Sequence, residues 1–175
     1  VRLEAPISCR INAMGSSSTG LSVISAWLAA DARPLTSPLH KGYRLCSRLD
    51  TMLQPHHMAQ RSGPDVGARL GQTALYRPDL DLVVLDGHNA VFWFDPETRT
   101  GLVEPMRTEE GHQRRGLARH LLTTGLDLLA RAGAERIKIC FSPNNKAARS
   151  LYLSVGFGPD KQTVVLSRQV KARVP

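Results

Sequence analysis

The stretch from Gly101 to Ala132 reads GLVEPMRTEEGHQRRGLARHLLTTGLDLLARA, and it decides the fold class. Residues 101–108 predict a strand in which Pro105 marks a bulge or an unpaired edge position. From Arg115 to Ala132, apolar residues recur at three- and four-residue steps, which indicates an amphipathic helix. A strand, a short polar loop and a long helix follow one another here, so the chain is expected to build a sheet covered by helices.

Further elements are expected on both sides of this unit. Leu80–Leu85 and Ala90–Phe94 flank the turn pair Asp86-Gly87, which predicts a hairpin. Arg136–Ser142 alternates apolar and polar residues, as a strand does. This order of elements predicts a mixed sheet with helices on its faces. The remaining predicted elements are strands at Tyr43–Cys46 and Thr163–Val170, and helices at Asp50–Gln60, Asp65–Leu75 (with Asp65 as N-cap) and Asn145–Val155.

Residues 1–40 carry a small polar run, Gly15–Gly20, and two prolines, and they show no sustained apolar period. They are predicted to be a flexible leader, or alternatively the remnant of a preceding domain, with the folded domain at residues 41–175. Leu21–Ala30 has about the length of the apolar region of a signal peptide. Since the segment before it is long and holds only scattered Arg, secretion is the minor alternative.

Composition limits the function classes. The chain has 175 residues, 42% of them hydrophobic and 22% charged, as one globular domain has. The net charge of +8 suits a nucleic acid or a polyanionic small ligand. No run approaches the roughly 18 to 20 apolar residues that span a bilayer, so no membrane association is expected. The three cysteines, Cys9, Cys46 and Cys140, form no CxxC pair, which favours a reducing cytoplasm over a disulfide framework or a zinc site.

The loop from Glu109 to Gly116 leads into the long helix and holds the pattern QxxGxA at Gln113–Ala118. A glycine at a helix start lets main-chain N–H groups approach a ligand, and the helix dipole adds positive potential there. Nearby arginines supply matching forks for phosphate oxygens, so the loop predicts a diphosphate site. The alternative is a solvated basic face around a flexible glycine.

Two stretches together resemble the GNAT superfamily of acetyl-CoA-dependent N-acetyltransferases. GHQRRGLARHLL (residues 111–122) looks like its pyrophosphate-binding motif, and NKAARSLYLSVGF (residues 145–157) resembles its second signature. The longer stretch LVEPMRTEEGHQRRGLARHLL is similar to a bacterial subgroup that reads roughly EPVGTHPDHRRRGLA. The resemblance covers about Leu80 to Val170. It implies an α/β fold with a mixed, mostly antiparallel central sheet and helices on both faces.

The resemblance also implies a binding site for acetyl-CoA as cosubstrate. The strand before the loop is expected to bind the pantetheine arm through the main chain of Met106, Arg107 and Thr108. Asn145 and Ala148 are expected beside the pantetheine, and Tyr152 beside the thioester sulfur. The diphosphate is expected on the following residues: Gln113, Arg114, Arg115, Gly116, Leu117, Ala118 and Arg119.

Amine attack on a thioester needs a neutral nucleophile and a proton for the departing thiolate. Tyr152, with an ordinary pKa of about 10, is the expected donor, although it could instead be a core aromatic residue. Glu104 is the expected base, acting through water, unless it holds a main-chain group beside Pro105. Cys140 is expected to pack rather than to carry the acetyl group, and no metal site is expected at His56, His57, His88 or His112.

Three alternative functions follow for this chain. The leading one is acetyl transfer to a primary amine by direct attack in a ternary complex. The second is a catalytically weak CoA-binding or regulatory module derived from a tandem protein, which the short segment from Gly42 to Leu80 would explain. A nucleic-acid binder is disfavoured, because no aromatic-interleaved basic patch is present. The acceptor is left open among a protein N-terminus, lysine, aminoglycosides, polyamines and small metabolite amines, and so is a homodimer.

Overall fold

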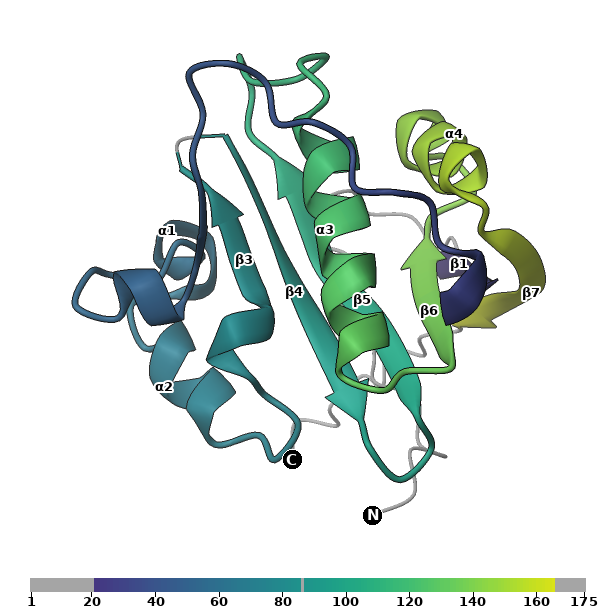
Figure 1. The fold of residues 1–175 in the computed structure, drawn as a ribbon, viewed down its shortest axis with the longest axis horizontal. Helices are drawn as coiled ribbons and strands as arrows, with labels where there is room; N and C mark the ends of the chain where they lie inside the picture. The colour runs from purple at the N-terminus through teal and green to yellow at the C-terminus, as the bar shows by residue number, and fades with distance from the viewer. Residues whose placement is uncertain (1–20, 86, 166–175) are drawn as a thin grey trace, which may run out of the picture.

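The computed structural model describes residues 21–85 and 87–165, and within them the chain forms a seven-stranded sheet ordered β2-β3-β4-β5-β6-β1-β7 (Figure 1). Neighbouring strands pair antiparallel except β5 and β6, which pair parallel. The expected mixed, mostly antiparallel sheet is confirmed. The strands are β1 (Leu21–Ala29), β2 (Leu45–Ser47), β3 (Asp81–Val84), β4 (His88–Asp95), β5 (Thr100–Thr108), β6 (Arg136–Phe141) and β7 (Gly158–Val165); the helices are α1 (Ala59–Ser62), α2 (Val66–Gly71), α3 (Leu117–Arg131) and α4 (Lys146–Val155), with 3-10 turns η1 (Ala30–Ala32), η2 (Leu49–Thr51) and η3 (Pro78–Leu80).

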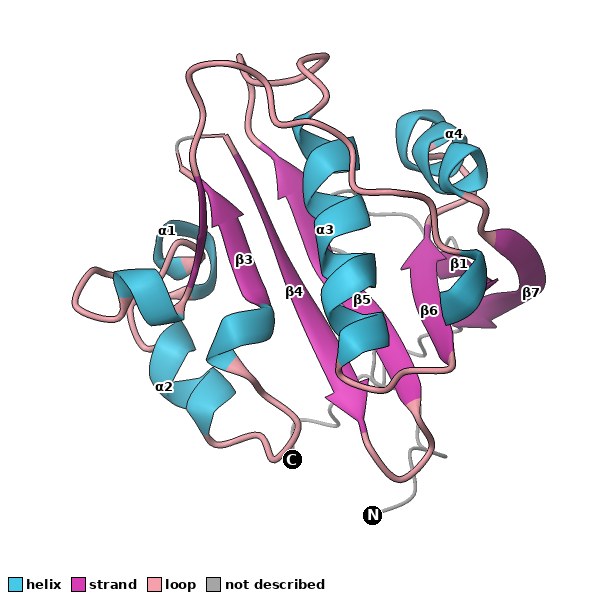
Figure 2. Ribbon diagram, viewed as in Figure 1, coloured by secondary structure: helices cyan, strands magenta, loops and turns pink. Residues whose placement is uncertain are grey.

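The long helix α3 packs across one face of the sheet, over β4 and its neighbours (Figure 2). Five of its leucines, Leu117, Leu121, Leu122, Leu126 and Leu129, are buried there. Gly125 lies so close to Phe92 that an added Cβ would come within 2.0 Å of the ring. Because side chains alternate along a strand, Trp93 faces the opposite side. There its ring lies 6.1 Å from that of Tyr76, between centroids. His56 and Tyr76, which flank the α1–α2 segment, both bond Asp81 of β3, so this segment lies beside β3 on the second face.

Pro105 lies where the pairing of β4 and β5 is irregular. Ala90 pairs with Met106 and Phe92 with Val103, so two residues of β5 stand opposite one residue of β4. This is a β-bulge, and it places the residue without an N–H at a position that needs no ladder hydrogen bond. The bulge predicted at Pro105 is therefore confirmed.

The structure corrects the expected flexible leader for residues 21–40. Strand β1 lies inside the sheet, antiparallel to β6 on one side and to β7 on the other. Ala26 and Leu28 are buried in the core, at 0% and 4% exposure. The segment that follows crosses α3, where the N–H of Ser37 donates to Thr123 Oγ1 at 2.9 Å and its carbonyl contacts His120 Nδ1 at 2.6 Å (Figure 1). Residues 1–20 lie outside the described part of the chain.

The helices expected at Arg115–Ala132 and Asn145–Val155 are confirmed as α3 and α4. Their observed bounds lie within two residues of the expected ones. The helix expected at Asp50–Gln60 is wrong: the chain forms a 3-10 turn and reaches α1 only at its end. Pro55 interrupts this stretch, since it lacks an N–H and disfavours helical backbone at the residue before it. Asp65 does precede α2, but its side chain makes no cap bond and pairs with Arg69 at 3.1 Å instead. No helix among the described residues is long and apolar enough to cross a membrane.

Candidate functional site

The two parallel strands of the sheet separate part-way along their length. Their pairing runs from Thr100 opposite Arg136 to Val103 opposite Ile139 and ends there. Beyond that point β5 pairs only with β4, up to Thr108 opposite His88. Along such an edge, alternate main-chain N–H and C=O groups point away from the one partner strand. Met106, Arg107 and Thr108 therefore lie on an edge that can pair with an extended, amide-containing ligand.

The loop after β5 presents a row of free donors at the start of α3. Within the described part of the chain, the main-chain N–H groups of residues 113–119 have no acceptor. Gly116 stands before the helix with φ at 74°, and open space surrounds the position of an added Cβ. A positive φ is cheap for glycine and costly for a residue with a side chain. Exposed N–H groups at the positive end of a 15-residue helix make an anion site.

Contacts from a distant segment hold this loop in place. The hydroxyl of Tyr43 lies 2.9 Å from His112 Nδ1 and accepts a hydrogen bond from Arg115 at 2.8 Å. Arg119 donates to Ser154 Oγ of α4 at 2.8 Å, which fixes the start of α3 against α4. Arg114 is exposed and makes no such contact with the other described residues. Of the three arginines, it is the one whose guanidinium is available to a ligand.

Helix α4 brings the second group of expected residues to the same end of the sheet. Asn145 is its N-cap: the side-chain oxygen accepts the N–H of Ala148 at 3.0 Å. The observed contact is thus a helix cap, which leaves the amide nitrogen of Asn145 for a ligand. Tyr152 is 6% exposed, and its ring packs edge-on against Phe141 and Phe157, at centroid distances of 5.5 and 6.2 Å. This packing fixes the direction of the Tyr152 side chain.

Glu104 lies at the bulge, on the face of the sheet away from α3. Its carbonyl accepts the indole N–H of Trp93 at 2.6 Å, and its side chain is half-buried. It borders a mostly apolar pocket of about 350 Å³ with Trp93, Leu102, Pro105 and residues 73–75. Burial raises the pKa of the Cys140 thiol, and Glu104 adds to that rise against the opposing effect of Lys138. A raised pKa disfavours a Cys140 thiolate, as expected for a packing residue.

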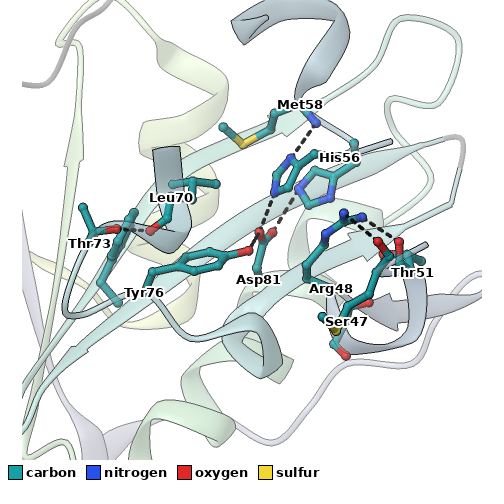
Figure 3. A network of polar contacts seen from close by, with 12 residues as sticks. Ser47, Arg48, Thr51, His56, Met58, Leu70, Thr73, Tyr76 and Asp81 are labelled. Atoms are coloured by element: carbon teal, nitrogen blue, oxygen red, sulfur yellow. Dashed lines mark hydrogen bonds and ion pairs between the residues drawn. The ribbon is translucent and has the colours of Figure 1, made fainter. Parts of the chain in front are cut away.

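The buried carboxylate of Asp81 holds residues 56–76 on the sheet face that points away from α3 (Figure 3). Asp81 is 0% exposed, and its Oδ2 accepts hydrogen bonds from His56 Nε2 at 2.8 Å and from the Tyr76 hydroxyl at 2.6 Å. His57 Nε2 lies 3.0 Å from Oδ1, although the pair is not aligned as a hydrogen bond. Burial alone would raise the pKa of Asp81, but these donors outweigh burial and lower it to about 2. Tyr76 responds in the other direction, its pKa raised by burial and by Asp81.

His56, His57 and Asp81 also lie close enough together to suggest a metal site. The hydrogen bonds of His56 argue against this interpretation. The N–H of Met58 donates to His56 Nδ1 at 3.1 Å, so the ring proton sits on Nε2 and points at Asp81 (Figure 3). A metal-bound histidine needs its lone pair on the coordinating nitrogen and donates from the other one. The observed arrangement therefore suits a hydrogen-bonded buried carboxylate.

The structure brings most of the expected site residues to one end of the sheet, around the gap between β5 and β6. Glu104 and Met106–Thr108 belong to the part of β5 beyond its pairing with β6, and residues 113–119 form the loop and helix start that follow this strand. Ala148 and Tyr152 lie on α4 with Asn145 as its N-cap, and Arg119 joins this helix to α3. Sequence reasoning missed Tyr43, Trp93, and the cluster around Asp81. Tyr43 and His57 lie in segments with weak sequence signals. The strand that carries Asp81 was predicted, but only the fold brings His56, His57 and Tyr76 to it.

Comparison with known proteins identifies the family of this chain. Residues 83–157 match the acetyltransferase (GNAT) family. Over 138 residues, 77% of this chain, the sequence is 30% identical to mycothiol acetyltransferase of Beutenbergia cavernae. The chain covers 41% of that relative, less than half its length.

Solved structures show the same fold. A GCN5-related N-acetyltransferase from Sphaerobacter thermophilus superposes with a TM-score of 0.64 at 15% identity, covering 83% of this chain and 50% of that one. A tandem GNAT protein from the clavulanic acid biosynthesis pathway gives 0.62 at 13% identity, covering 84% and 53%. The chain thus corresponds to about half of each of these proteins.

Proposed function

Because this chain belongs to the GNAT acetyltransferase superfamily, we propose that it transfers an acetyl group from acetyl-CoA to a primary amine, by direct attack in a ternary complex. One observation carries the proposal: the free edge of β5 leads straight into the row of free N–H groups at residues 113–119. An extended amide arm that ends in a diphosphate matches this combination. The short loops and neutral main-chain donors suit acetyl-CoA better than a nucleic acid.

The residues of this chain supply binding and proton transfer. The edge at Met106–Thr108 pairs with the pantetheine arm, and residues 113–119 hold the diphosphate with help from the Arg114 guanidinium. Acetyl-CoA supplies the activated acetyl group. Glu104 accepts the proton that the amine loses, through water, as the N–C bond forms, and Tyr152 gives a proton to the sulfur as the C–S bond breaks. We expect no metal in this reaction.

The apolar pocket beside Glu104 is the proposed route of the amine. It lies on the sheet face covered by the α1–α2 segment, so acceptor and cosubstrate reach the gap from different sides. A relative of this chain is named mycothiol acetyltransferase, and that name supports a small-molecule acceptor over a protein. The proposal includes the cytoplasmic location expected from the cysteine pattern.

Binding and chemistry are tested in two steps. Acetyl-CoA and CoA should each raise the melting temperature of the protein, by mass action on the folded state. Release of free CoA thiol is then followed with a panel of primary amines. A protein whose melting temperature rises but that releases no thiol with any amine would be a CoA-binding module, and an absent thermal shift would exclude acetyl-CoA as ligand.

The diphosphate site is tested by replacing two arginines, one in the loop before α3 and one in the last turn of that helix. Arg114→Ala removes the free guanidinium at the start of α3, whereas Arg131→Ala removes an exposed one in its last turn, where it pairs with Asp127 at 2.8 Å. Arg114→Ala should weaken acetyl-CoA binding about tenfold, and Arg131→Ala should leave it unchanged. Equal affinities of both variants in isothermal titration would place the diphosphate elsewhere.

A further inference from the structure

Residues 33–44 form a strap that runs from the turn after β1, across α3, to the start of β2 (Figure 1). The strap is fixed to α3 near its beginning, where Arg33 donates to Asp127 Oδ1 at 3.0 Å, and in its middle by the contacts of Ser37. Tyr43, near its far end, makes a third attachment. This attachment is made to the proposed diphosphate site, and not to the body of the helix.

The hydroxyl of Tyr43 joins two positions of the phosphate loop, residues 109–116. It accepts a hydrogen bond from Arg115 at 2.8 Å and lies 2.9 Å from His112 Nδ1. A phenolic hydroxyl carries one proton and free lone pairs, so it can donate to His112 while it accepts from Arg115. The guanidinium of Arg115 also lies over the Tyr43 ring, 5.9 Å from its centroid. One side chain of the strap therefore cross-links the loop.

The ring of Tyr43 also packs where the phosphate loop meets the β3–β4 hairpin. A Cβ added at Gly87 would come within 3.1 Å of this ring, 2.7 Å of Leu117 and 3.5 Å of His112. The carbonyl of Gly87 accepts the N–H of Glu109 at 2.9 Å. The loop is thus packed against the hairpin and bonded to the strap.

The part of the loop that Tyr43 holds has an unfavourable backbone conformation. Arg114 has a φ of 62° and Gly116 a φ of 74°, and Arg115 lies between them. A residue with a side chain adopts a positive φ only at a cost, so the conformation of Arg114 needs support from its surroundings. The hydrogen bond from Arg115 to Tyr43 supplies such support next to the exposed N–H groups.

We propose that Tyr43 is a positioning residue for the cosubstrate: its hydroxyl holds Arg115 and His112 so that the N–H groups of residues 113–119 face the diphosphate before it binds. The inference rests on the proposed function and assigns a role to a residue outside the family match, which covers residues 83–157. Donors that are already in place lose little conformational freedom on binding, so Tyr43 contributes to affinity. It touches no reacting atom in this scheme.

Tyr43→Phe removes the hydroxyl and keeps the ring that packs against the hairpin. Its affinity for CoA, measured by isothermal titration, should be about tenfold lower than that of wild type. In the thiol-release assay, KM for acetyl-CoA should rise by a similar factor while kcat stays the same. Acetyl-pantetheine ends before the diphosphate, so its kcat/KM should be equal for the variant and wild type. His112→Ala breaks the same link from the loop side and should give the same pattern.

Arg33→Ala is the matched control, because it detaches the strap from α3 without contacting the phosphate loop. Its affinity for CoA should stay within about twofold of wild type. His40→Ala serves if Arg33→Ala does not fold, and the same result is expected. His40 is exposed, and its ring meets the ring of Tyr43 edge-on at 5.8 Å between centroids.

A loss of affinity for CoA in Tyr43→Phe, with acetyl-pantetheine unaffected, supports the inference. An unchanged affinity, or an equal loss with acetyl-pantetheine or in Arg33→Ala, would overturn it and leave Tyr43 with a general role in folding. If CoA binds but no acetyl transfer is seen, the titrations alone decide the inference. Wild-type protein that binds no CoA would instead reject the proposed function, so the two failures are distinguishable.

Discussion

At the scale of single residues, Asp81 shows how a buried charge is kept. A carboxylate removed from water is unfavourable unless it is paired, and here His56, His57 and Tyr76 surround it from a different segment of chain. The same contacts tie residues 56–76 to strand β3. The charge of Asp81 therefore attaches residues 56–76 to β3, and residues of this segment line two pockets on this face of the sheet: the apolar pocket beside Glu104, and a polar pocket of about 310 Å³.

Asp81→Asn should lower the free energy of unfolding by about 2–4 kcal/mol at pH 7, because an amide cannot satisfy donors arranged for a carboxylate. The folded pKa of about 2 lies below the ordinary value of 3.8, so the contribution of Asp81 is present above pH 4 and is lost as the pH falls through 2. Urea unfolding from pH 6 to pH 2 measures both proteins. If the free energies of unfolding of wild type and Asp81→Asn fell in parallel with pH, the prediction would be contradicted, because the other carboxylates contribute equally in both proteins.

Tyr152→Phe tests the proposed proton donor. The ring contacts with Phe141 and Phe157 remain, so the free energy of unfolding should change by no more than about 1 kcal/mol. Loss of a general acid should lower kcat roughly 10- to 100-fold at saturating acetyl-CoA, with little effect on its KM. An unchanged kcat would assign Tyr152 to the core alone, and a large rise in KM would assign it to cosubstrate binding.

The elements that form the proposed cosubstrate site could be predicted from sequence, because its residues are local in the chain. Gly116, its arginines and Asn145 lie at the ends of elements with clear periodicity, so their placement follows from the pattern. The polar pocket could not be predicted. His57 and Asn89 line this one pocket although they come from different elements, and the α1–α2 segment between them has weak sequence signals.

At the scale of elements, the helices and strands that could be predicted from sequence are those with one apolar face and one polar face. Helix α3 and strand β6 each have one apolar side, and their periods are visible in the sequence. Strand β1 was missed because it reads LSVISAWLA, with small or apolar residues on both faces. A strand paired on both sides shows no clean alternation, and its partners lie more than 100 residues away in sequence.

Gly125→Ala tests the packing of α3 on β4. The new methyl group would lie about 2 Å from the Phe92 ring, so helix and sheet must separate or the ring must move. Although alanine favours a helix, overpacking should lower the free energy of unfolding by about 3 kcal/mol or more. Thr124→Ala at the neighbouring position is the control and should cost less than about 1 kcal/mol. A stability equal to wild type in urea unfolding would show that this contact is loose.

At the scale of the whole molecule, the sheet consists of two groups of strands joined by one short parallel pairing. Strands β2 to β5 form one group, and β6, β1 and β7 form the other. The gap between them is the proposed cosubstrate site, so its width depends on both groups. Because β1 lies between β6 and β7, the N-terminal part of the described chain completes the group that carries α4 and Tyr152.

The integration of β1 is tested by adjacent substitutions on its two faces. Leu28 is 4% exposed and faces the core, whereas Ala29 is exposed. Leu28→Asp removes a buried leucine and places a carboxylate in the core, so it should lower the free energy of unfolding by about 4 kcal/mol or more. Ala29→Asp should cost less than about 1 kcal/mol. A flexible leader would tolerate both changes equally, and equal urea midpoints for the two variants would therefore refute the place of β1 in the sheet.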